Sequence, residues 1–161
     1  MPIQIKQKKV HRFLNEIFFL FLFLPSLLFA QNIKIVDGDT IHISKIKYRF
    51  HGIDAPEMSQ ICKLNNKNIK CGLLSKKKLV EKIGNKKVSC LKETIDRYKR
   101  VVAECFVNNE SLSKYLVKNG YAFAYRKYSK KFVEEENYAK ENKLGLWSMD
   151  FQYPWDYRRN K

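Results

Sequence analysis

Three short β-type segments follow one another near the start of the chain, at Ile33 to Val36, Thr40 to Ser44 and Ile46 to Ile53. Apolar and polar residues alternate within the second segment, which is the pattern of a strand with one buried face. The chain therefore begins as a half-buried β-sheet, and acidic and basic residues stand at the ends of its strands.

Helical patterns and further strands follow this sheet. Two more strands are expected at Val88 to Cys90 and Val101 to Val107, and three helices at Leu73 to Ile83, Ser111 to Gly120 and Ser129 to Lys143. The chain has no internal repeat and no long linker. The sequence predicts a β-rich α+β fold, a five-stranded barrel with three helices.

The first 30 residues have the pattern of an export signal. Four basic residues precede an apolar run from Ile17 to Ala30, which is interrupted at Pro25. This run is shorter than the roughly 20 residues of a membrane-spanning helix, which favours a signal peptide over residues 1–30 that is cleaved after Ala30. The alternative is a leader that is retained as a membrane anchor.

The remainder of the chain is strongly basic. Residues 31–161 carry 28 Lys and Arg against 15 Asp and Glu, a net charge of +13. Such an excess suits a polyanionic partner, although a charge excess alone also describes a solvated surface.

Four cysteines in an exported chain are expected to form disulfides, because the compartments outside the cytoplasm are oxidising. Cys90 and Cys105 fall on two strands that can pair, and Cys62 and Cys71 bracket a Lys/Asn-rich loop over residues 63–70. We therefore predict the pairs Cys62–Cys71 and Cys90–Cys105. A zinc site is the competing interpretation, but the chain has no Cys-x-x-Cys pair.

Acids and arginines recur at the ends of the strands. The first group is Asp37-Gly38-Asp39-Thr40, and the others are Arg49, then Asp54-Ala55-Pro56-Glu57, then Asp96-Arg97-Tyr98-Lys99-Arg100. Carboxylates can hold a hard cation, arginine can bind a phosphate with two donors, and a glutamate can orient a water. These are the parts needed to hydrolyse a phosphodiester.

In this order the motifs resemble those of the thermonuclease (staphylococcal nuclease-like) family, from about Ile33 to Trp147. The resemblance implies an OB-fold over residues 31–148, with residues 149–161 as an aromatic and basic C-terminal extension. It also implies a nuclease that cleaves DNA and RNA with low sequence specificity and leaves 3′-phosphate ends.

The resemblance also assigns a metal site. Asp39 and Asp54 correspond to carboxylate ligands of Ca²⁺, and the backbone carbonyl of Ala55 to a third ligand. Because the protein supplies only these three ligands, Ca²⁺ is expected to bind weakly, with a dissociation constant of about 10⁻⁴ to 10⁻³ M. Alternatively, Asp39 only makes a turn and Asp54 only caps a loop. Asp37 is expected to support the turn rather than to bind the metal.

The remaining roles are catalytic and substrate-binding. Glu57 resembles the glutamate that orients or deprotonates the attacking water, and Arg49 and Arg100 resemble the arginines that bind the scissile phosphate. Lys99 stands where the family commonly has glycine, which would strain the turn before Arg100 if φ is positive there.

Tyr125 and Tyr128 are candidates for stacking on substrate bases, with a packing role as the alternative, whereas Trp147 is expected to be a core residue.

The sequence thus predicts a secreted or periplasmic, monomeric, Ca²⁺-dependent nuclease that does not associate stably with a membrane. The alternative is an exported OB-fold module that binds single-stranded nucleic acid or another polyanion without cutting it.

Overall fold

The computed structural model describes residues 31–161, so the predicted signal peptide over residues 1–30 lies outside the described residues. The main sheet has the strand order β1-β2-β3-β8-β7. Its strands are β1 (Ile33–Ile35), β2 (Thr40–Ile43), β3 (Ile46–Phe50), β7 (Ser89–Ile95) and β8 (Val101–Val107). Neighbours are antiparallel except β3 and β8, which run parallel.

The predicted β-rich α+β fold of the OB type is confirmed, and β1 and β7 are the edge strands of this sheet. The short β9 (Glu110–Ser111) adds to β8, and β4 (Ile53–Asp54) pairs with β10 (Phe123–Ala124) apart from the main sheet. A register shift at Lys92 and Thr94 bends β7 against β8.

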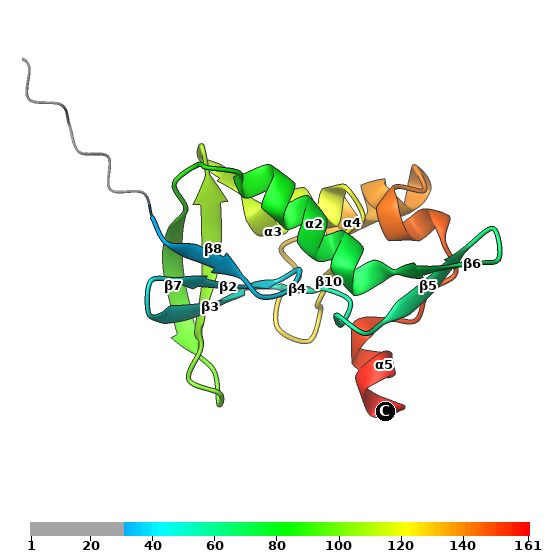
Figure 1. Ribbon diagram of the computed structural model, residues 1–161, viewed down its shortest axis with the longest axis horizontal. Helices are drawn as coiled ribbons and strands as arrows, with labels where there is room; N and C mark the ends of the chain where they lie inside the picture. Colours follow the sequence, from blue (N-terminus) through cyan, green and yellow to red (C-terminus); the bar gives the residue numbers. More distant parts are fainter. Residues whose placement is uncertain (1–30) are drawn as a thin grey trace, which may run out of the picture.

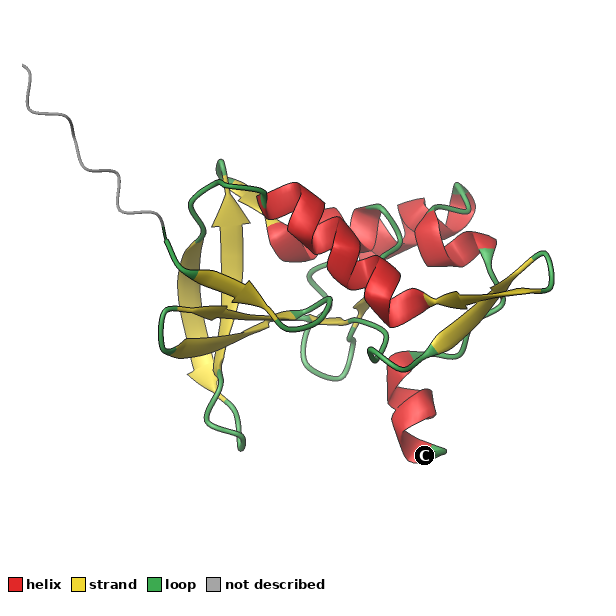
Figure 2. Ribbon diagram, in the orientation of Figure 1, coloured by secondary structure: helices red, strands yellow, loops and turns green. Residues whose placement is uncertain are grey.

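Helices pack beside the sheet, and the end of the molecule away from the sheet is formed by further helices and a small β-hairpin (Figures 1 and 2). The three expected helices are α2 (Cys71–Ile83), α3 (Leu112–Lys118) and α4 (Val133–Glu141), followed by the 3₁₀ helix η1 (Gly145–Ser148). Ser111 caps α3 by accepting the N–H of Lys114 at 3.2 Å. The prediction placed the start of α4 too early, because residues 129–132 are not helical and the helix begins only at Val133.

Residues 63–70 are not a loop, as the sequence predicted, but most of a hairpin of β5 (Ile61–Leu64) and β6 (Lys67–Lys70). Asn65 and Asn66 have φ of 48° and 63°, the left-handed conformation that a two-residue hairpin turn requires. Both disulfides are formed as predicted. Cys62 of β5 is bonded to Cys71, the first residue of α2, and Cys90 of β7 is bonded to Cys105 of β8.

Another helix, α5 (Pro154–Arg159), lies below the β5–β6 hairpin in the view of Figure 1. No helix is predicted there from the sequence pattern. The main core lies between the sheet and α2 and α3, and includes Ile41, Phe50, Leu79 and Leu116. A second cluster surrounds Phe123 and draws on the C-terminal extension. Trp147 packs edge-on against Phe123 in this cluster, which confirms it as a core residue.

Within the described residues, no helix is both long enough and apolar enough to span a membrane.

Candidate active site

Asp39 reaches the site from the turn that leads into β2. The side chain of Asp37 accepts the N–H of Asp39 at 3.0 Å, which supports the turn, and the Asp39 carboxylate accepts the N–H of Ala55 at 2.7 Å. Gly38 allows this approach, because a Cβ at position 38 would collide with Ser75 and Ala55. Burial raises the pKa of Asp37, and the positive charge of Arg49 opposes this shift.

Arg49 joins the two aspartates. It lies on β3 opposite Thr40, and its Nη1 contacts Asp39 while its Nη2 donates to Asp54 Oδ1 at 2.8 Å and to the Ile53 carbonyl at 3.3 Å. Asp54 is fully buried. Burial lowers the pKa of Arg49, and the neighbouring carboxylate of Asp54 opposes part of this shift. The structure thus brings Asp39, Arg49 and Asp54 together.

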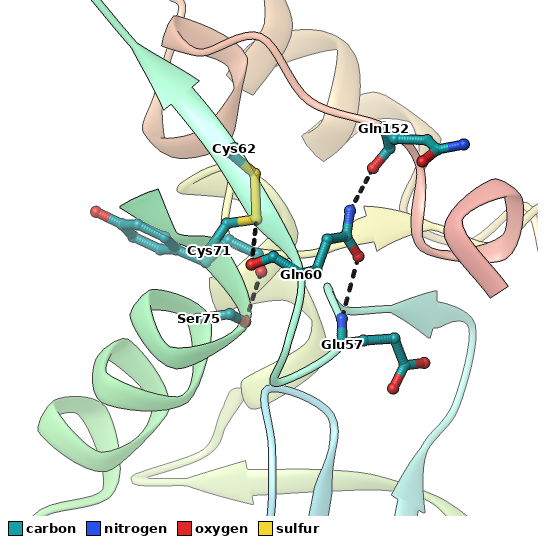
Figure 3. Close-up of a disulfide and its surroundings, with 7 residues drawn as sticks. Glu57, Gln60, Cys62, Cys71, Ser75 and Gln152 are labelled. Carbon is teal, nitrogen blue, oxygen red and sulfur yellow. Dashed lines mark hydrogen bonds between the residues drawn. A yellow bond between two sulfur atoms is a disulfide. The ribbon is translucent and has the colours of Figure 1, made fainter. Parts of the chain in front are cut away.

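Glu57 follows in the segment of residues 55–60, called here the Glu57 loop. The buried Gln60 holds this loop, because its side chain accepts the N–H of Glu57 at 3.2 Å and donates to the Gln152 carbonyl at 2.6 Å (Figure 3). Gly72 packs so closely on the Glu57 carbonyl that a Cβ would not fit. The Glu57 carboxylate remains partly exposed.

Arg158 also lies in this site, although no sequence pattern predicts it there. From α5, its Nη1 and Nη2 donate to the two Asp54 oxygens at 3.2 and 2.6 Å, and Nη1 also donates to Glu57 at 2.8 Å. Burial lowers the pKa of Arg158, but the hydrogen bonds to Asp54 and Glu57 outweigh burial and raise it overall. The only available sequence signal was the motif Pro154-Trp155, which suits the start of a helix.

Arg100 is close enough to Arg49 to affect its pKa, but its own side chain is bound to Asp96. Its Nε donates to Asp96 at 2.7 Å within the turn between β7 and β8, and its charge contributes to lowering the pKa of Arg49. Lys99 has a φ of 62°, so lysine occupies a backbone conformation that favours glycine, at a cost of about 1 kcal/mol. The turn nevertheless holds Arg100 through Asp96.

The two candidate tyrosines differ in exposure. Tyr125 lies parallel to Trp155 with ring centroids 5.3 Å apart, so one of its faces is already covered. Tyr128 meets Tyr125 edge-on and is 68% exposed. Tyr128 is therefore the more accessible of the two for a base.

The donor atoms suit a hard divalent cation, although the described residues contain no group of three His, Cys, Asp or Glu side chains arranged as a metal site. Asp39 and Asp54 both contact the guanidinium of Arg49, which bridges their carboxylates. Carboxylate oxygens are the ligands that Ca²⁺ and Mg²⁺ prefer, and no thiol or imidazole is among the predicted ligands.

Comparison with known proteins agrees with this geometry. Residues 47–149 match the model of a family described as staphylococcal nuclease homologue. The chain is 32% identical to the probable staphylococcal-like nuclease CAN3 of Oryza sativa subsp. japonica, over 76% of this chain and 31% of that protein. It is 30% identical to the staphylococcal-like nuclease CAN1 of Arabidopsis thaliana, over 77% of this chain and 36% of that protein.

An uncharacterized endonuclease of Haemophilus influenzae is 32% identical, over 72% of this chain and 64% of its own length. The chain thus spans about a third of the plant relatives and less than two thirds of the bacterial one. The family match includes Arg49, Asp54, Glu57 and Arg100, whereas α5 lies beyond it.

Proposed function

Because the chain belongs to the staphylococcal nuclease homologue family, we propose that it is a nuclease that hydrolyses phosphodiester bonds of DNA and RNA with low sequence specificity. The observation that carries the proposal is the cluster of Asp39, Arg49 and Asp54 beside the Glu57 loop. A module that only binds nucleic acid needs positive charge, but it needs no buried acids next to an arginine.

Each residue has a role that follows from its chemistry. Glu57 orients or deprotonates the water that attacks phosphorus, since a partly exposed carboxylate on a fixed loop can reach that water. Arg49 and Arg100 stabilise the negative charge that develops on the phosphoryl oxygens. The bond between phosphorus and the 5′ oxygen breaks, which leaves a 3′-phosphate.

Asp39, Asp54 and the carbonyl of Ala55 are the proposed ligands of Ca²⁺. When bound, the cation would neutralise charge on the scissile phosphate. Because two carboxylates are a small ligand set, the affinity is expected to be weak.

The proposed substrate and location follow from charge and cysteine chemistry. A net charge of +13 over residues 31–161 attracts a polyanion, and the exposed Tyr128 offers a face to any base. Two disulfides suit an oxidising compartment, so we propose an exported monomer with residues 1–30 as its signal peptide, a domain over residues 31–148 and an extension over residues 149–161.

The test is cleavage of single-stranded DNA by the purified protein with Ca²⁺, with Mg²⁺ and with a chelator. We expect cleavage with Ca²⁺, none with chelator and little with Mg²⁺, which demands a tighter octahedral shell. Glu57→Gln should lower kcat by about 10²- to 10⁴-fold with little change in substrate affinity. The exposed Glu93 on β7 is the matched control, and Glu93→Gln should cleave like the parent protein.

If the folded protein binds single-stranded DNA but does not cleave it with Ca²⁺, the nuclease proposal is rejected. That result would favour the noncatalytic OB-fold module instead.

A further inference from the structure

The C-terminal segment, residues 149–159, is attached to the Glu57 loop and the adjoining hairpin at several points. Asp150 pairs with Lys63 of β5 through two backbone hydrogen bonds of 2.9 Å. The Gln152 carbonyl accepts from Gln60 at 2.6 Å, and the hydroxyls of Tyr157 and Ser59 lie 3.1 Å apart. These contacts fix the segment next to the proposed catalytic glutamate.

An aromatic stack sets the orientation of α5. The rings of Tyr153, Trp155 and Tyr125 lie nearly parallel, with centroids 4.6 and 5.3 Å apart. Residues three positions apart share one face of a helix. Arg158 therefore lies on the same face as Trp155, one turn further on, and this turn brings it to Asp54 and Glu57.

Arg158 keeps part of its binding capacity free. A guanidinium has five N–H donors, and three of them are used in the hydrogen bonds to Asp54 and Glu57. Within residues 31–161 the side chain makes no other hydrogen bond, which leaves one donor on Nη2 and the donor on Nε. These two form the second fork of the planar group, and a fork of this kind matches two oxygens of a phosphate.

The surroundings of this free fork suit an anionic strand. Arg158 is 40% exposed, whereas Arg49 is 15% exposed and its Nη1 and Nη2 already contact Asp39, Asp54 and the Ile53 carbonyl. Arg158 also borders an open groove of about 530 Å³, whose lining carries Lys127, Trp155 and Arg159 but no acid.

We propose that Arg158 is a third arginine of the active site, which binds a phosphate of the nucleic-acid strand through its free fork while its other donors hold Asp54 and Glu57. This inference rests on the proposed nuclease function, and it makes the C-terminal extension part of the site. The acid contacts position the proposed base, and the free fork holds the phosphate beside it.

The first test measures binding in a protein that does not cleave. Glu57→Gln and the double variant Glu57→Gln/Arg158→Gln are titrated with a short single-stranded oligodeoxythymidylate at several salt concentrations. Loss of one phosphate contact should make the slope of log K against log salt about 0.7 shallower. The control is Lys87→Gln in the same background, which removes one charge from an exposed site between α2 and β7 and should leave the slope unchanged.

The second test measures cleavage. Arg158→Gln should lower kcat by about 10²- to 10³-fold, and Arg158→Lys should also fall well below the parent, because lysine keeps the charge but has no planar fork. Circular dichroism and thermal unfolding verify that each variant is folded.

The two tests separate the two proposals. A shallower slope in the double variant supports Arg158 as a phosphate ligand even if the parent protein cleaves nothing, in which case the nuclease proposal fails alone. An unchanged slope overturns the Arg158 proposal. It is equally overturned if Arg158→Gln binds Ca²⁺ more tightly by calorimetry and cleaves faster than the parent, since Arg158 would then compete with the cation for Asp54.

Discussion

Arginine residues compensate the charge of the buried acids at this site. Arg49 contacts Asp39 and Asp54 from the sheet, and Arg158 contacts Asp54 from the other side. Removing one partner of a buried ion pair leaves an uncompensated charge, which typically costs about 3 to 5 kcal/mol. Substitution of Arg49 is therefore expected to reduce both stability and phosphate binding. Arg158 is more exposed, so its substitution should cost less stability and should report on phosphate binding more directly.

Asp96 holds Arg100 in place and makes the stability of the fold depend on pH. Its carboxylate accepts the N–H groups of Tyr98 and Arg100, each at 2.9 Å, and the Arg100 Nε–H at 2.7 Å. Burial raises the pKa of Asp96, but these hydrogen bonds outweigh burial, and the net pKa lies below the usual value. A group with a lowered folded pKa stabilises the fold above its unfolded pKa of about 3.9, and this stability is lost as the pH falls through the folded pKa.

We therefore expect Asp96→Asn to lower the free energy of unfolding near neutral pH, and the difference from the parent to shrink as the pH falls below about 4. Urea unfolding of both proteins between neutral and acidic pH measures this. A difference that stays constant over the whole range would show that the charge of Asp96 does not contribute.

At the scale of elements, the two disulfides connect different parts of the molecule. Cys90 and Cys105 join β7 to β8 in the main sheet, whereas the Cys71 N–H donates to the carbonyl of Gln60 within the Glu57 loop at 3.1 Å. The bridges close loops of 15 and 9 residues, so each should contribute about 3 kcal/mol on the chain-entropy account.

Replacing either cysteine pair by alanine should lower the free energy of unfolding by about 2 to 4 kcal/mol. At low temperature, the variant without Cys90–Cys105 should keep its kcat, while the variant without Cys62–Cys71 should lose activity because Gln60 no longer holds Glu57 firmly. Chemical unfolding and single-strand cleavage measure the two effects. Equal kcat values for the two variants would contradict a role of the Cys62–Cys71 disulfide in positioning Glu57.

Elements with a strong hydrophobic period could be predicted from the sequence, and elements without one could not. The core strands and α3 have regular apolar patterns. Apart from Ile61, the exposed positions of the β5–β6 hairpin are polar, so its strands show no regular apolar pattern and its main local signal is the pair Asn65-Asn66. The helix α5 has six residues, too few to show a period, and it is held by stacking on Tyr125.

The same distinction holds for the candidate site. Asp39, Arg49 and Asp54 come together because β2 pairs with β3 and β4 follows directly, which local patterns anticipate. Arg158 lies 104 residues from Asp54 and 101 from Glu57 along the chain. Its position depends on tertiary packing of the extension against Phe123 and Tyr125, which no local pattern reports.

At the scale of the whole molecule, charge and aromatic surface contribute differently to binding. The net charge of +13 over residues 31–161 acts on any polyanion and is screened by salt. The exposed ring of Tyr128 acts on bases, and stacking depends little on salt. Binding measured against salt can therefore separate the two contributions.

For Glu57→Gln, the affinity for single-stranded DNA should fall steeply with salt, with a slope of roughly −0.7 per phosphate contact. Four contacts would give a drop of about 50-fold over a fourfold rise in salt. Adding Tyr128→Ala should weaken binding by about 1 to 3 kcal/mol at every salt concentration and leave the slope unchanged, because a lost stacking contact releases no counterions. Fluorescence anisotropy with a labelled oligonucleotide measures both quantities. An affinity that does not change between low and moderate salt would rule out a polyanion-binding groove. If Tyr128→Ala changed the slope, the tyrosine would act by positioning neighbouring basic side chains rather than by stacking.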